Sequence, residues 1–212
     1  PRILTGGLVG ICLSLSGCIL QGVMRNTMAS PSTIGVTSGA SFVGYLVLVV
    51  FPGYTRLLTI GSILGAFATT MLIYALAYQK GVSPVKMILS GMAVSALFGA
   101  FNDMIKTFFP DALSSVSGFL VGGLNGSSWS HFQMILPYAL TGIVACLFLP
   151  GKMNILMLGD ETANALGLRT EWFRFLLIVI SSLLAGAAIS VAGLISFVGL
   201  VVPHIARLLV GS

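Results

Sequence analysis

Long uninterrupted apolar runs constrain the fold of this chain more than any other feature. Residues 3–24 contain no charged side chain, and as one helix they are long enough to cross roughly 30 Å of hydrocarbon. Across the 212 residues, 57% are hydrophobic and 7% are charged, whereas soluble domains carry about 25% charged residues. No water-facing fold could hide so much apolar surface, so the solvent must be lipid. We therefore predict an all-α, polytopic membrane helical bundle, with residues 1–212 forming one domain.

Seven apolar runs are the candidate membrane spans, and Pro, Gly or charged residues separate most of them. They are residues 3–24, 33–51, 57–78, 87–109, 132–149, 175–192 and 195–210. Only Gly193 marks the boundary between the last two runs. An odd number of crossings places the two ends of the chain on opposite sides of the membrane.

Residues 151–174 form the one long polar stretch, and they hold six of the fifteen charged residues. Lys and Arg collect on the cytoplasmic side of membrane proteins. If this stretch is cytoplasmic, the inner side holds Arg25, Lys80, Lys86, Lys152, Arg169, Arg174 and Arg207. The outer side then holds Arg2, Arg56 and Lys106. We therefore expect an external N-terminus, a cytoplasmic C-terminus, and a cytoplasmic polar stretch that can meet a soluble partner.

Motifs of membrane enzymes and of nucleotide-binding proteins are absent from the sequence, which has no HExxH pair and no glycine-rich phosphate loop. Cys12, Cys18 and Cys146 lie in apolar runs without CxxC spacing, which is typical of packing residues rather than of a zinc site or a disulfide framework. The basic residues are dispersed singly, which argues against nucleic-acid binding. We expect no catalytic residue, no metal and no cofactor, so any nucleotide energy must come from a partner.

Small residues recur at four-residue spacing in the apolar runs, and this spacing lets helix backbones approach closely. Gly91, Ser95 and Gly99 follow it on a run that ends near Asp103 and Lys106, which can pair on one face. Tight packing is the simpler interpretation, and a smooth translocation wall is the alternative. Further pairs are Gly6 and Gly10, Gly35 and Gly39, and Gly61 and Gly65.

One pattern of small residues occurs twice in the chain. The first run holds Gly10, Ser14 and Gly17, and the sixth run repeats the same spacing in Gly186, Ser190 and Gly193. By the orientation above, these two helices run in opposite directions. Such an echo is typical of the inverted repeats found in transporters.

Three longer segments carry a family resemblance. Residues 16–40 contain Ser-Gly-x-x-x-Gln, then Arg-Asn-Thr-Met-Ala-Ser-Pro, then Ile-Gly-x-x-x-Gly-Ala. Residues 156–167 contain Leu-Gly-Asp-Glu-Thr-Ala and Leu-Gly, and residues 193–207 contain Gly-Leu-Ile-Ser-Phe-Val-Gly-Leu and Pro-His-Ile-Ala-Arg. In this order, they resemble FecCD/BtuC-type permease subunits of ABC importers for iron–siderophore complexes, haem and vitamin B12. Thr27 stands where that family usually has proline, and residues 118–124 lack the tryptophan and Gly-Ser-Leu often found there.

The resemblance implies a type II ABC importer permease, a homodimer of ten-span subunits with inverted repeats in the cell membrane of a bacterium or archaeon. This chain would then be a fragment that lacks about one span before Pro1 and two after Ser212. The implied partners are a cytoplasmic ABC ATPase subunit and an extracytoplasmic substrate-binding protein. We expect ATP-driven import of an iron–siderophore complex or a related chelate such as haem or cobalamin.

The resemblance also implies site residues. Two short coupling helices would dock into the ATPase through Gly159, Asp160, Glu161, Ala163, Leu166 and Gly167. The chemistry agrees, because acids favour the start of a helix, glycines permit turns and small apolar side chains enter grooves; a solvated loop is the alternative. Arg2 would meet the substrate-binding protein outside, with a snorkelling arginine as the alternative. The span with Gly91, Ser95 and Gly99 would line part of the pathway.

Two other functions stay open from the residues alone. A secondary transporter driven by an ion gradient would need ionisable groups near the middle of the bilayer, whereas Asp103 lies near the end of its run. A membrane enzyme would need a pair of catalytic groups, and the sequence offers no recognisable one.

Overall fold

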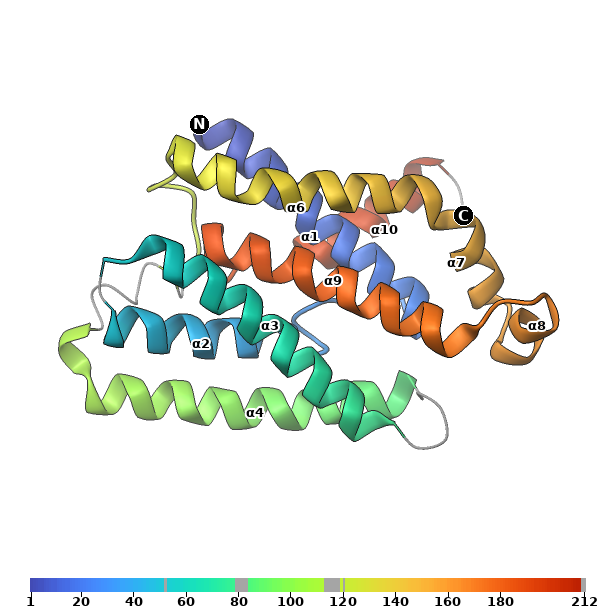
Figure 1. The fold of residues 1–212 in the computed structure, drawn as a ribbon, viewed down its shortest axis with the longest axis horizontal. Coiled ribbons are helices and arrows are strands. Elements are labelled where there is room, and N and C mark those ends of the chain that lie inside the picture. The colour runs from blue at the N-terminus through green and yellow to red at the C-terminus, as the bar shows by residue number, and fades with distance from the viewer. Residues whose placement is uncertain (52, 79–83, 113–118, 120, 211–212) are drawn as a thin grey trace.

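The computed structural model describes residues 1–51, 53–78, 84–112, 119 and 121–210, and every regular element in these ranges is a helix. The longer helices are α1 (Arg2–Met24), α2 (Val36–Val50), α3 (Thr55–Ala77), α4 (Pro84–Phe108), α6 (Trp129–Phe148), α9 (Thr170–Ala192) and α10 (Val198–Val210). The shorter ones are the 3-10 helix η1 (Pro110–Ala112), α7 (Pro150–Met157) and α8 (Asp160–Ala165) (Figure 1). The prediction of an all-α membrane bundle is confirmed. Lys80 lies outside the described residues.

Five of the described helices, α1, α3, α4, α6 and α9, are long and apolar enough to cross a membrane. By contrast, α2 has 15 residues and α10 has 13, so at about 1.5 Å per residue they fall short of the roughly 30 Å of hydrocarbon. Non-helical segments precede both, residues 25–35 before α2 and residues 193–197 before α10. Within the first segment Ala29 and Ser30 are buried, as irregular backbone at membrane depth requires.

The crossing of α1 and α9 forms the centre of the bundle. Figure 1 shows the two helices running in opposite directions, with the N-terminus toward one end of the molecule and α8 at the other. Ser16 and Ser181 are fully buried at the crossing. Their Oγ atoms lie 2.7 Å apart, and each Oγ also lies within hydrogen-bond distance of the other residue's carbonyl oxygen, at 2.8 and 3.2 Å, so the two hydroxyl protons serve two of these three contacts at a time. These reciprocal bonds fix the register of the two central helices.

Glycines bring several helix pairs to backbone contact. A Cβ added at Gly17 on α1 would lie 1.8 Å from the carbonyl oxygen of Gly199 on α10. A Cβ at Gly65 on α3 would lie 2.5 Å from the carbonyl oxygen of Gly39 on α2. The tight packing predicted from small-residue spacing is therefore confirmed at Gly39 and Gly65.

The repeated pattern of small residues takes different places in the two central helices. Gly17 lies inside α1, whereas Gly193 is the residue that ends α9, with a φ of 70°. The first allows α10 to pack closely, and the second reverses the chain. The repeated pattern therefore does not mark equivalent positions in the two helices. Even so, α1 and α9 have 23 residues each, and each leads into a short helix.

Candidate coupling site

Two short helices fill the polar stretch, and we call residues 150–169 the coupling segment. Pro150 begins α7 at a position that needs no backbone N–H. Gly159 and Gly167 have φ values of 117° and 84°, conformations that a residue with a Cβ adopts at a cost. These two glycines separate α7 from α8 and α8 from α9. Two short helices are therefore present, but Gly159 lies between them and Gly167 after them, whereas we expected Gly159 before them and Gly167 between them.

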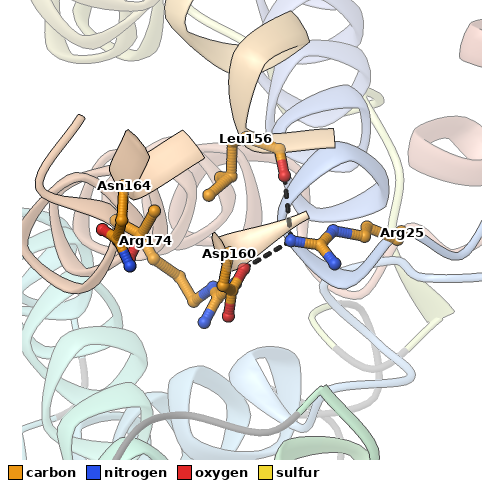
Figure 2. Close-up of polar contacts among 6 residues, drawn as sticks. Arg25, Leu156, Asp160, Asn164 and Arg174 are labelled. Atoms are coloured by element: carbon orange, nitrogen blue, oxygen red, sulfur yellow. Dashed lines mark hydrogen bonds and ion pairs between the residues drawn. The ribbon is translucent and has the colours of Figure 1, made fainter. Parts of the chain in front are cut away.

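Asp160, the first residue of α8, joins the coupling segment to both central helices. Its Oδ1 accepts a hydrogen bond from Nη2 of Arg174 on α9 at 2.8 Å. The same oxygen accepts a short hydrogen bond from Nη2 of Arg25, at the end of α1. Arg25 Nη2 also donates to the carbonyl oxygen of Leu156 on α7 at 2.9 Å (Figure 2). We call these four residues the Asp160 node.

Arg25 has an uncommon backbone conformation for its residue type. It caps α1 in the left-handed region, with φ 47° and ψ 39°, where glycine is the usual residue. A side chain there costs roughly 1–2 kcal/mol. The two acceptors that the guanidinium reaches, Asp160 and Leu156, give a physical reason for an arginine at this position.

The node is also an electrostatic unit. The side chain of Arg174 is only 3% exposed, while that of Asp160 is 47% exposed. A buried guanidinium needs a nearby negative charge, because burying an unpaired ion is expensive. Partial burial opposes the charged form of Asp160, but the hydrogen bonds and charges of Arg174 and Arg25 outweigh it and hold the pKa of Asp160 below its ordinary value.

Reasoning from the sequence placed Arg25 and Arg174 only on the cytoplasmic side and missed their common partner. Arg174 stands at the start of an apolar run, and a charge at that place must find a counter-ion or water. Only three acids, Asp160, Glu161 and Glu171, lie in the polar stretch before it. That signal restricts the choice of partner, but only the fold selects Asp160.

The other predicted coupling residues divide into an inner and an outer set. Ala163 is fully buried, so it packs inside the segment. Glu161, Leu166 and Gly167 are exposed, and the Leu166 side chain is 59% exposed although it is apolar. The outer set is what a soluble partner could touch.

The predicted pathway residues lie on α4 in three different environments. Gly91 is buried, and a Cβ there would lie 2.3 Å from the carbonyl oxygen of Ile34. Ser95 accepts a weak hydrogen bond from the Ser38 hydroxyl on α2 at 3.4 Å. Nothing lies within 4 Å of a Cβ built at Gly99. Gly91 therefore allows α4 to approach the chain before α2, whereas Gly99 borders open space.

Arg2, the predicted docking residue, is the first residue of α1, and the N-terminus lies toward the opposite end of the molecule from α8 (Figure 1). It is exposed, and its Nη2 donates to the carbonyl oxygen of Asn125 at 2.8 Å. Arg2 therefore also ties the start of α1 to the segment before α6.

Comparisons with known proteins agree with these features. The model of the FecCD transport family matches residues 1–212. The probable siderophore transport system permease protein YfhA of Bacillus subtilis is 37% identical over 220 residues, covering 100% of this chain and 64% of the relative. The cobalamin import system permease protein BtuC of Halobacterium salinarum is 38% identical over 213 residues, covering 100% of this chain and 58% of the relative. The chain thus spans less than two thirds of the length of both relatives.

A solved structure shows the same arrangement of helices. It is an ABC transporter assigned to the metal-chelate type, in an inward-facing conformation. Its sequence is 34% identical to this chain, and the two superpose with a TM-score of 0.93 over 100% of this chain and 68% of the other. Because the family match runs from the first residue to the last, this multi-pass cell-membrane protein belongs to the FecCD transport family.

Proposed function

We propose that this chain forms part of the permease subunit of an ATP-driven ABC importer for an iron–siderophore complex or a related metal chelate. The observation that carries the proposal is the coupling segment, because it is anchored to both central helices through Asp160 and presents Glu161 and Leu166 outward. The names of the relatives, which include siderophore and cobalamin permeases, support the substrate class. They leave the chelate itself open among siderophore, haem and cobalamin complexes.

The permease itself breaks no bond in this scheme. The sequence lacks a phosphate-binding loop, so ATP is hydrolysed on a separate cytoplasmic ATPase that docks on the outer set of coupling residues. A substrate-binding protein docks toward the other end of the molecule, at the start of α1 that Arg2 forms. Two permease subunits enclose the pathway, with Ser95 and Gly99 of α4 on its wall. Each state must bind the partners with different affinity, since only differential binding shifts a conformational equilibrium.

The test uses the full-length permease with Glu161→Lys. Reversing this exposed charge places a cation at the start of α8, where the helix dipole favours an anion, and puts it in the docking face. We expect copurification of the ATPase to fall at least about tenfold, which corresponds to about 1.4 kcal/mol of lost binding. The matched control is Asp111→Lys, an equally exposed acid on η1, which should leave ATPase binding unchanged.

Two outcomes would contradict the proposal. Equal ATPase binding by the wild type and Glu161→Lys would remove the segment from the docking surface. Uptake that survives depletion of ATP but collapses with an ionophore would show a secondary transporter driven by an ion gradient.

A further inference from the structure

We infer that Asp160 is a positioning residue that clamps the coupling segment to α1 and α9, while the ATPase grips the opposite, exposed side of α8. This inference rests on the proposed function and deepens it. It separates two roles that the family motif groups together, because Asp160 and Glu161 are neighbours in the chain but face different surroundings.

The contacts of Asp160 are internal to the chain and come from two different helices, the distant α1 and the neighbouring α9. Arg25 lies 135 residues before it and Arg174 lies 14 residues after it. Charge-assisted hydrogen bonds of this kind are about twice as strong as neutral ones. Because both bonds end on one oxygen atom, the loss of a single carboxylate removes both charge-assisted bonds at once. The hydroxyl of Thr170 on α9, which donates to Asn164 on α8 at 3.1 Å, then remains as a neutral contact.

The conformation of Arg25 gives an independent reason to assign a role to its side chain. A glycine would end α1 in the left-handed region without strain. The arginine keeps a disfavoured conformation and reaches α7 and α8 through Leu156 and Asp160. An observed backbone outlier of this type points to a functional constraint.

The side of α8 that faces the bundle is buried and the opposite side is exposed, as separate roles in clamping and in ATPase docking require. Ala163 is fully buried on the inner side. Glu161 and Leu166 are exposed and make no contact that holds α8 to the bundle among the hydrogen bonds and ion pairs of the described residues. A displacement applied to the outer side is therefore passed through Asp160 to the ends of α1 and α9, which meet again at the buried Ser16–Ser181 crossing.

The experiment compares Asp160→Asn, Asp160→Glu and Arg25→Gly in the full-length permease, reconstituted with its ATPase and binding protein. The readout is the coupling ratio, the amount of iron chelate transported per ATP hydrolysed. Asp160→Asn should lower this ratio at least about fivefold, the lower end of a typical coupling free energy, while the ATPase still copurifies. Asp160→Glu keeps the carboxylate, so its coupling ratio should lie between those of Asp160→Asn and the wild type. Arg25→Gly relieves the backbone yet should lower the ratio as Asp160→Asn does.

The control is Asp103→Asn, which removes an exposed acid that pairs with Lys106 at 2.8 Å on α4 and should leave the coupling ratio at the wild-type value. A variant that merely folds poorly loses transport and ATP hydrolysis in proportion, so an unchanged ratio in Asp160→Asn overturns the inference. Loss of ATPase copurification in Asp160→Asn would also overturn it, because Asp160 would then be a docking contact. If the wild type binds no ATPase at all, the proposed function itself fails.

Discussion

The substitution Gly17→Ala should push α10 away from α1. A Cβ at this position would lie 1.8 Å from the carbonyl oxygen of Gly199, 2.5 Å from its carbonyl carbon and 2.7 Å from its Cα. Carbon atoms in contact are about 3.5 Å apart, so the carbonyl carbon at 2.5 Å alone requires the two helices to separate by about 1 Å or to tilt, and the oxygen at 1.8 Å requires more. All three obstructing atoms belong to the backbone, and no side-chain substitution at Gly199 can make room.

A shift of that size weakens the whole contact between the helices, because a gap of 0.5–1 Å already forfeits about a quarter to a half of the dispersion energy of each atom pair. Overpacking of this kind costs about 1–3 kcal/mol. It would also strain the short hydrogen bond from Arg207 on α10 to Gln21 on α1. We therefore expect a loss of about 1–3 kcal/mol in unfolding free energy for Gly17→Ala.

Unfolding of the full-length permease in mild detergent, titrated with a denaturing detergent and followed by circular dichroism, measures this difference. The matched control on the same helix is Gly7→Ala, because Gly7 is exposed and nothing lies within 4 Å of a Cβ built there. The control should be more stable than the wild type by about 0.5–1 kcal/mol, because alanine is the better helix former. If Gly17→Ala is as stable as Gly7→Ala, the close approach of α1 and α10 does not exist as described.

Two further predictions concern the polar contacts. The pKa of Asp160 is held below its ordinary value, so the stability from its charge is present above about pH 4, the unfolded value, and is lost as pH falls through the lower folded value. The difference in unfolding free energy between the wild type and Asp160→Asn should not change with pH near neutrality and should shrink toward zero in acid. A difference that changes with pH near neutrality would contradict this assignment. At the buried crossing, a double-mutant cycle of Ser16→Ala and Ser181→Ala should give a coupling energy of about 0.6 kcal/mol, and strict additivity would show that the hydroxyls do not interact.

Local features of the fold could be predicted from the sequence because they depend on neighbouring residues. The apolar runs 3–24, 57–78 and 175–192 predict α1, α3 and α9 with ends that differ by at most five positions. Pro150, Gly159 and Gly167 predict the breaks that create α7 and α8. In each case, the residue restricts its own backbone conformation, so no knowledge of distant contacts is needed.

The start of α2 could not be predicted from hydrophobicity. The run 33–51 is apolar throughout, yet the helix begins only at Val36, after Gly35 with a φ of 88°. The chain before it is held by local side-chain bonds, such as the Ser30 N–H to the Thr33 hydroxyl at 2.8 Å. Hydrophobicity reports burial in lipid or protein, and buried irregular backbone has the same composition as a buried helix.

The pathway residues show a second limit of sequence reasoning. Gly91 and Gly99 are both glycines, and each lies four residues from Ser95 on the same helix. Gly91 nevertheless packs against the backbone at Ile34, whereas Gly99 faces open space. A small residue is equally suited to a close contact and to a smooth wall. Only the position of α2 beside α4 separates the two uses, and that position depends on residues far along the chain.

The polar contacts that join α1 to α9 differ in charge between the Asp160 node and the centre of the bundle, and this difference bears on the proposed coupling. At the Asp160 node, two guanidinium groups hold one carboxylate, and such charge-assisted bonds resist separation. At the centre, α1 and α9 are joined by the neutral hydroxyls of Ser16 and Ser181, a type of contact worth about 0.6 kcal/mol in membranes. We expect a displacement of α8 to reach α1 and α9 through the node, and any sliding of these two helices past each other must break the serine contacts at their crossing. Strengthening that crossing should slow transport, while weakening the node should waste ATP.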